Sequence, residues 1–370
     1  MNIKFNNHIY KINPYVPGKP EEVLKRELGV DNIIKMASNE NPLGTSPKAL
    51  EAMKKEITKS YFYPDDTYYR LKQKLAEKHK VTTDNIILGS GSVELIKMIA
   101  SAVITGGDYA LISKNSFLMY QKVIQEFAGE EYIVWIDTTD DYAYDINGFS
   151  KALKENDKIK IIFMANPNNP TGTYMNEEEL YKFIKDVPDN ILIVLDEAYV
   201  EYVEADDFSS GEKWLKEFPN LILLRTMSKV YGLAGLRIGY GVGDKKLISG
   251  LMKVRLPFNV SRLAAVAAEA ALDDDKFLQL SFDTNKKGKK YLMKELSELG
   301  FRVIPSQTNF LMFIPDIEPI KLVKGLEKAG IIIRPLAAFG IKEAVRVTIG
   351  TMEQNKIFIE NLKEIMKEFK

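Results

Sequence analysis

The feature that most constrains this fold is a series of short apolar runs between residues 86 and 242, most of them bounded by Gly, Asp, Asn or Pro. Short runs of this kind are typical of strands buried on both faces of a sheet. Amphipathic stretches such as Glu177–Lys185 separate several of them. Repeated alternation of strand and helix predicts an α/β domain with a mostly parallel sheet. The predicted strands are Ile86–Leu88, Tyr109–Ile112, Tyr132–Ile136, Lys160–Met164, Ile191–Leu195, Leu221–Leu224 and Ile238–Val242.

After Pro257 the pattern changes, and longer helical stretches accompany a few short apolar runs. This part predicts a smaller α+β unit. The first 45 residues are rich in Pro, Asn and Gly, with one predicted helix. We therefore predict an N-terminal arm over 1–45 that joins the small domain, a large domain over 46–265, and a small domain over 266–370. The helices expected outside the large domain's core are Glu21–Leu28, Ser261–Leu272, Phe277–Leu299, Ile320–Lys328 and one from about Glu353; the strands are Val303–Ile304, Phe310–Ile314, Ile331–Ile333 and Val345–Ile349.

Composition excludes several classes of function. The 370 residues carry 51 basic and 51 acidic side chains, so the chain is not built around a polyanion such as nucleic acid. There is no cysteine and there are only two histidines, which excludes disulfides and His-rich or thiolate metal sites. His79 lies in a charged run and is expected at a solvated helix end. No apolar run approaches the roughly 18 residues of a membrane helix, and no stretch resembles a signal peptide. We expect a cytoplasmic protein with small-molecule partners and no metal.

Ligands of open α/β sheets bind beyond the carboxyl ends of the strands, so the residues that follow each run are candidates. After Ile86–Leu88 comes Gly89–Glu94, a Gly-rich turn that opens a predicted helix and could bind a phosphate through free backbone N–H groups. An ordinary tight turn is the alternative. The dinucleotide fingerprint does not fit, because Glu94 stands where its third glycine belongs.

Three further runs end in polar residues. Asn166–Gly172 is a rigid turn that could hold an amide donor, or simply a Pro/Gly loop. Asp196 could keep a ring nitrogen protonated, or cap a helix. Lys229 could form a Schiff base, or be one lysine among many, while Thr226, Ser228 and Arg237 are good phosphate ligands. Because all these groups follow strands of one sheet, they can face one crevice, and together they meet the needs of pyridoxal phosphate.

The ordered series of motifs resembles the fold-type I aminotransferases, and among them those that act on histidinol phosphate. The resemblance covers nearly the whole chain. The motifs that carry it are Asn13–Gly18, Ser38–Pro42, Tyr63–Asp65, Gly89–Glu94, Asn166–Gly172, Asp196–Tyr199, Arg225–Lys229, Gly235–Arg237, Thr308–Phe310 and Val345–Gly350. It implies an α/β fold with a mostly parallel seven-stranded central sheet covered by helices on both faces, plus a smaller α+β domain.

The resemblance also implies a role for each site residue. Lys229 would bond to pyridoxal phosphate as a Schiff base and shuttle a proton, and Asp196 would keep the pyridine nitrogen protonated. Asn169 and Tyr199 would hydrogen-bond the ring O3′, and Phe117 would stack on the ring. The family usually has Pro-Thr-Tyr where this chain has Asn115-Ser116-Phe117, a change expected only to tune the reaction. The phosphate would be held by Ser92, Val93, Thr226, Ser228 and Arg237, together with Tyr63 of a neighbouring subunit, so the active site would need a homodimer.

Substrate binding would fall to Arg346, supported by Arg334, Tyr15 and Asn39. For Arg334 and Tyr15, a structural ion pair and a packed arm residue are the alternatives. The implied reaction is transamination between L-histidinol phosphate and 2-oxoglutarate in histidine biosynthesis. Two related activities stay open, namely an aromatic aminotransferase acting on phenylalanine and tyrosine, and a lyase resembling threonine-phosphate decarboxylase. A non-catalytic protein of the same fold is a third alternative, against which the complete set of cofactor residues counts.

Overall fold

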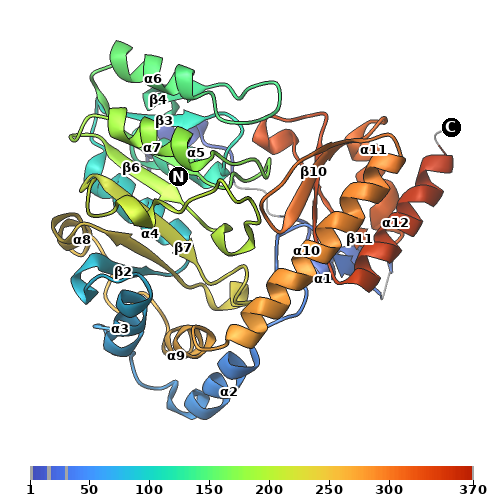
Figure 1. The fold of residues 1–370 in the computed structure, drawn as a ribbon, viewed down its shortest axis with the longest axis horizontal. Helices are drawn as coiled ribbons and strands as arrows, with labels where there is room; N and C mark the ends of the chain where they lie inside the picture. Colours follow the sequence, from blue (N-terminus) through green and yellow to red (C-terminus); the bar gives the residue numbers. More distant parts are fainter. Residues whose placement is uncertain (1–2, 15–17, 30–31, 369–370) are drawn as a thin grey trace.

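The computed structural model describes residues 3–14, 18–29 and 32–368 (Figure 1). Within these residues seven strands form a central sheet in the order β2-β8-β7-β6-β5-β3-β4. Every neighbouring pair is parallel except the two made by β8, which runs antiparallel to β2 and β7. The predicted mostly parallel seven-stranded sheet is confirmed. Its strands are β2 Ile86–Gly89, β3 Tyr109–Ser113, β4 Ile133–Ile136, β5 Ile159–Ala165, β6 Leu192–Asp196, β7 Leu221–Thr226 and β8 Gly239–Gly243.

Helices cover both faces of this sheet, as expected. On β5, Ile161 and Phe163 pack into the core with α4, α5 and α8, whereas Ile162 and Met164 pack with α6 and α7. Near the β2 edge the second layer is made by α2, α3 and α9. Burial on both faces explains the apolar run Ile161–Met164 in the middle of β5. The helices are α2 Pro47–Glu56, α3 Tyr69–Lys78, α4 Ser92–Val103, α5 Leu118–Phe127, α6 Ile146–Glu155, α7 Glu177–Asp186, α8 Lys245–Leu251 and α9 Arg262–Ala271.

A second, antiparallel sheet has the order β12-β13-β10-β9 and packs against α10, α11 and α12 (Figure 1). Of the predicted run Ile331–Ile333, only Ile331 and Ile332 form a strand, β11, which pairs with β1. The chain then leaves this pairing, and β12 (Arg334–Pro335) pairs with β13 in the second sheet. The elements are β9 Arg302–Ile304, β10 Phe310–Ile314, β11 Ile331–Ile332, β12 Arg334–Pro335, β13 Val345–Thr348, α10 Asp275–Glu298, α11 Pro319–Lys328 and α12 Met352–Lys367.

The N-terminal segment contacts this second unit. β1 (Ile34–Lys35) pairs in parallel with β11, and the Lys19 ammonium lies 2.9 Å from the Glu327 carboxylate on α11. The helix α1 occupies the predicted range, Glu21–Leu28. A domain boundary at 265/266 would cut α9, whose buried alanines pack with α2 and the β2 edge of the large sheet. We propose that the two domains instead divide between α9 and α10.

The expectation of a solvated position for His79 is wrong. The side chain is buried at the end of α3, with Nε2 3.0 Å from the Tyr240 hydroxyl of β8 and Nδ1 3.0 Å from the Glu212 carboxylate. The charged run around it gave no sign that this helix end packs against the sheet. Within the described ranges, no helix is long and apolar enough to cross a membrane.

Candidate active site

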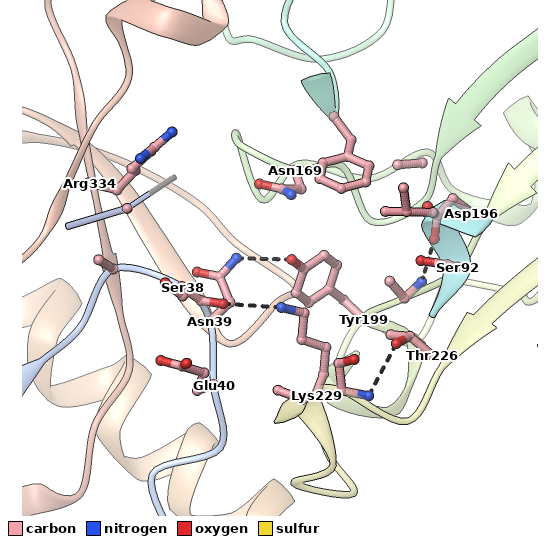
Figure 2. Close-up of a pocket in the computed structure, with 18 of the residues that line it drawn as sticks. Ser38, Asn39, Glu40, Ser92, Asn169, Asp196, Tyr199, Thr226, Lys229 and Arg334 are labelled. Atoms are coloured by element: carbon pink, nitrogen blue, oxygen red, sulfur yellow. Dashed lines mark hydrogen bonds between the residues drawn. The ribbon is translucent and has the colours of Figure 1, made fainter. Parts of the chain in front are cut away.

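A pocket of about 390 Å³ lies beside the carboxyl ends of β2, β5, β6 and β7, where β8 begins (Figure 2). The N-terminal segment Ala37–Glu40 and the second sheet form its opposite wall. Thirteen of the predicted site residues line this pocket: Asn39, Ser92, Val93, Phe117, Asn169, Asp196, Tyr199, Thr226, Ser228, Lys229, Arg237, Arg334 and Arg346. Tyr63 does not, because it lies on the outer surface with 76% of its area exposed. Tyr15 lies outside the described residues.

Lys229 follows β7 by three residues and extends into the pocket, where its Nζ donates a hydrogen bond to the Ser38 carbonyl at 3.2 Å (Figure 2). Burial lowers the pKa of this amine to about 7, and the positive charges of Arg346 and Arg237 contribute in the same direction, against Glu40 and Asp196. A substantial fraction of the amine is therefore neutral near pH 7. A neutral lysine amine is a nucleophile able to attack an aldehyde carbon.

Asp196 ends β6 and faces the pocket from the large sheet. Its Oδ1 accepts a hydrogen bond from the Ala198 N–H at 3.1 Å, and its Oδ2 accepts one from the Tyr120 hydroxyl at 2.9 Å. Burial raises the pKa of this carboxyl to about 6, while these two hydrogen bonds oppose the rise. Asp196 is therefore largely ionised at pH 7. A buried carboxylate needs a cationic partner, and a protonated ring nitrogen would supply one.

The turn between β2 and α4 offers a cradle for an anion. Gly91 caps α4 with φ 78°, a backbone conformation that L side chains rarely adopt, and a Cβ there would lie 2.6 Å from the Arg237 guanidinium. A Cβ on Gly239 would lie 2.8 Å from the Ser92 backbone nitrogen. Both glycines therefore leave room for the amides at the start of α4 to stand beside Arg237. This combination of helix amides and a guanidinium suits a phosphate group.

The second sheet contributes two arginines. Arg346 on β13 and Arg334 on β12 are direct cross-strand partners, so both side chains emerge on the same face of the sheet. Arg346 donates hydrogen bonds to the Asn169 side-chain oxygen and, at 2.9 Å, to the Ala37 carbonyl, and its guanidinium lies 5.0 Å from the Phe310 ring centroid. Figure 2 shows Arg334 across the pocket from Asp196.

Asn39 and Tyr199 hold each other in the wall between the two sheets. The Asn39 amide donates to the Tyr199 hydroxyl at 2.9 Å (Figure 2). The Asn39 backbone N–H donates to Thr348 Oγ1 at 2.9 Å. Asn39 has φ 57°, a value that asparagine tolerates better than most residues. The side-chain oxygen of Asn169 is engaged by Arg346, so its amide N–H groups are the donors that this residue can offer to a ligand.

Sequence reasoning missed several lining residues, including Ser38, Glu40, Tyr120 and Phe339. Tyr120 could have been found, since it lies three residues after Phe117 at the start of one helix, and such positions share a face. Phe339 follows a short strand that carries no motif of its own. Nothing in the local sequence indicates that it would lie 5.9 Å from the Arg346 guanidinium.

An amine of lowered pKa, a buried carboxylate and an anion cradle at the carboxyl edge of an α/β sheet define a pyridoxal-phosphate enzyme. Comparison with known proteins agrees. Residues 31–362 match the family model described as aminotransferase class I and II. The chain is 42% identical over 357 residues to histidinol-phosphate aminotransferase 2 of Carboxydothermus hydrogenoformans, covering 96% of this chain and 97% of that protein. It is 41% identical to histidinol-phosphate aminotransferase of Caldicellulosiruptor saccharolyticus, covering 98% and 100%.

Among solved structures, histidinol-phosphate aminotransferase from Sinorhizobium meliloti in complex with pyridoxal 5′-phosphate superposes with a TM-score of 0.90 at 27% identity, covering 99% of this chain and 98% of that one. The chain belongs to the aminotransferase class I and II family. It is a transaminase, and its cofactor is pyridoxal phosphate.

Proposed function

We propose that this transaminase converts L-histidinol phosphate and 2-oxoglutarate into imidazole-acetol phosphate and L-glutamate, in histidine biosynthesis. One structural observation carries the proposal. The amine of Lys229 shares its pocket with two arginines from neighbouring strands, Arg334 and Arg346. Such a pair can bind either the α-carboxylate of glutamate or the phosphate of histidinol phosphate, so one site serves both halves of the reaction. The relatives at 41–42% identity carry this activity in their names. A biosynthetic role of this kind favours a cytoplasmic location.

When bound, pyridoxal phosphate supplies an aldehyde carbon and an electron-withdrawing ring. In our proposal Lys229 would attach the cofactor and would afterwards move a proton at the substrate Cα. Asp196 would hold a proton on the ring nitrogen. Asn169 and Tyr199 would donate to the ring oxygen, and Phe117, which precedes α5, would pack against the ring.

The phosphate of the cofactor is assigned to the cradle at the start of α4. Ser92 and Val93 would contribute backbone N–H groups, Thr226 and Ser228 hydroxyls, and Arg237 its guanidinium. Ser228 is fixed from within the turn, because its backbone N–H donates to Thr226 Oγ1 at 3.1 Å. On the substrate side Arg346 is the main anion ligand and Arg334 the second. Asn39, whose amide donates to the Tyr199 hydroxyl, is a third candidate for the substrate side, and Tyr15 remains a candidate on the arm.

A homodimer would complete the site. Three consecutive aromatic residues, Tyr61, Phe62 and Tyr63, are 78%, 55% and 76% exposed. A cluster of exposed aromatic side chains is typical of a surface that binds another protein. Tyr63 stacks on Phe258 at 4.6 Å between ring centroids, which holds it at the surface. We propose that this face packs against a second copy and that Tyr63 reaches the phosphate of the partner's cofactor.

A second candidate is an aromatic aminotransferase, which would be suited by Phe339, whose ring centroid lies 5.9 Å from the guanidinium groups of both Arg334 and Arg346. The experiment is a set of half-reactions with the reconstituted protein and one amine donor at a time. We expect the visible band of the lysine-bound cofactor to bleach with L-histidinol phosphate and with L-glutamate, and barely with L-phenylalanine. Equal bleaching by phenylalanine would replace the proposal with the second candidate. Release of carbon dioxide from threonine phosphate in place of amino transfer would contradict both.

A further inference from the structure

Tyr120 is a buried phenol that contacts the site without belonging to the residues predicted from the sequence. It lies on α5 and is fully buried, and its hydroxyl donates to Asp196 Oδ2 at 2.9 Å. The ring is fixed on two sides. Phe163 of β5 stacks on it at 5.1 Å with an interplanar angle of 10°, and Phe117 meets it edge-on at 5.6 Å. The direction of the hydroxyl is therefore set by packing before any ligand binds.

Tyr120 can act only as a donor to this carboxylate. Burial and the nearby charge of Asp196 raise the pKa of the phenol well above its ordinary value, so the proton stays on the tyrosine at any physiological pH. The second oxygen of Asp196 is bound by the Ala198 N–H. Each oxygen of the carboxylate therefore accepts one hydrogen bond, and the side chain cannot rotate without losing both hydrogen bonds.

We propose that Tyr120 is a positioning residue for Asp196. The Tyr120 hydroxyl keeps the Asp196 carboxylate ionised and directed toward the ring of the cofactor. The inference rests on the proposed role of Asp196 as the partner of the ring nitrogen. A protonated Asp196 would lose the negative charge that holds a proton on that nitrogen. Removal of the Tyr120 hydroxyl would bring protonation of Asp196 closer to neutral pH.

Other charged and titratable groups act on Asp196 as well. Glu197, the next residue, favours the protonated form, and Lys229 from the turn after β7 favours the ionised form. The phenol of Tyr144 is close enough for Asp196 to raise its pKa, but its hydroxyl is hydrogen-bonded elsewhere, to the Ala165 N–H and the Asn168 side chain. Tyr144 therefore offers a matched control, a second buried phenol near Asp196 that gives it no hydrogen bond.

The test compares Tyr120→Phe with Tyr144→Phe in the cofactor-free full chain. Aspartate labelled with carbon-13 at the side-chain carboxyl reports titration by NMR, and the signal of Asp196 is identified by its loss in Asp196→Asn. We expect a midpoint of about 6 in the wild type. Tyr120→Phe should raise it by about one pH unit, the equivalent of one hydrogen bond. Tyr144→Phe should leave it where the wild type has it.

The reconstituted variants give a second readout. In Tyr120→Phe the acidic limb of the transamination rate should lie at higher pH than in the wild type and activity should recover as pH rises, whereas a packing defect would lower the rate equally at every pH. Should Tyr120→Phe fail to fold, 3-fluorotyrosine at position 120, a stronger donor, should move the midpoint down. An unchanged midpoint in either variant, or an equal rise in Tyr144→Phe, overturns the inference. Since the titration needs no cofactor, its outcome is separate from whether the wild type performs transamination.

Discussion

Two groups of buried charges meet at the end of β6, and they differ in how the charges are paired. Asp196 and Lys229 face the pocket, and both are hydrogen-bonded to neutral groups. Asp196 accepts from a phenol and a backbone N–H, and Lys229 donates to a backbone carbonyl. The next residue, Glu197, faces away from the pocket. Its carboxylate lies 2.6 Å from the buried Arg225 guanidinium and accepts a hydrogen bond from the Gly211 N–H at 2.8 Å. We call Arg225, Glu197, Glu212 and His79 the ion-pair cluster.

The pKa values of the two groups follow from this difference. Burial moves the pKa of Lys229 down to about 7 and that of Asp196 up to about 6, which brings both close to neutral pH. In the ion-pair cluster, burial alone would lower the pKa of Arg225, but Glu197 and further carboxylates raise it above its ordinary value. Direct pairing thus fixes a charge, whereas burial beside neutral partners leaves a group able to gain or lose a proton. The first arrangement is suited to structure and the second to catalysis.

The largest expected effect is on Lys229. Lys229→Ala should lower transamination by more than about 10⁴-fold, because it removes both the covalent attachment and the proton transfer. Folding should be unaffected or improved, since a costly buried amine is lost. The measurement is steady-state transamination beside circular dichroism. Lys245→Ala, which alters an exposed lysine 3.8 Å from Asp84, serves as the control and should keep wild-type activity. Substantial activity in Lys229→Ala would contradict the assignment of Lys229 and Asp196 to catalysis.

Substitutions of the adjacent carboxylates Asp196 and Glu197 should have opposite effects, one on the catalytic rate and the other on the free energy of unfolding. Asp196→Asn should lower kcat/KM by about 10²- to 10³-fold, the usual effect of removing one oriented electrostatic group, and change stability little. Glu197→Gln should do the reverse. Breaking a buried ion pair by removing one partner costs about 3–5 kcal/mol in the free energy of unfolding, and Glu201 and Glu212 beside Arg225 should reduce that cost. Urea unfolding and initial rates on both variants provide the check, and the distinction between the two groups fails if the variants behave alike.

Two arginines extend the same contrast. Arg346→Ala should lower kcat/KM about 10- to 100-fold for L-glutamate and for L-histidinol phosphate, because each substrate loses charge-assisted hydrogen bonds. Arg225→Met should act mainly on stability, since Arg225 is occupied by carboxylates behind the site. The measurement is kcat/KM of each variant for L-glutamate and for L-histidinol phosphate, with one substrate varied at a time. A loss confined to one substrate would show that the two anions do not share Arg346.

The smallest effect is the pH dependence of stability in the cofactor-free protein. Between about pH 7 and its ordinary pKa of 10.5, Lys229 is protonated only in the unfolded chain, so its contribution to stability rises with pH. Between 3.8 and about 6, Asp196 is protonated only in the folded chain, so its contribution falls with pH. Glu212, whose pKa is lowered mainly by His79, contributes stability at neutral pH that is lost as pH falls.

These slopes are measured as the difference in unfolding free energy between the wild type and each of Lys229→Met, Asp196→Asn and Glu212→Gln, over a series of pH values. Opposite signs for Asp196 and Glu212 are expected in the acidic range. A difference that does not vary with pH for Lys229→Met would mean that its amine is not held at a lowered pKa.

The sequence predicted what depends on local pattern. The strands of the central sheet were found because most of their residues are buried, so each contains a short apolar run. Of the thirteen predicted site residues that line the pocket, Asp196, Lys229 and others lie at or just beyond strand ends of the central sheet, where a local pattern could point to them. Asn39, Arg334 and Arg346 come from the N-terminal segment and the second sheet, and they were predicted only from the family resemblance. The environment of His79 could not be found, because its partners Tyr240 and Glu212 are more than a hundred residues away in the chain. The change of strand partner after Ile332, from β1 to β13, depends on which strands lie beside this segment, and no local pattern encodes it.

The most direct test of the account is the identity of the lysine that binds the cofactor. The wild-type protein is loaded with pyridoxal phosphate, reduced with borohydride, digested and mapped by mass spectrometry. The account predicts that the added cofactor mass lies on Lys229 and that Lys229→Ala carries none at any defined position. Attachment of the cofactor to another lysine in the wild type, or to none, would contradict it.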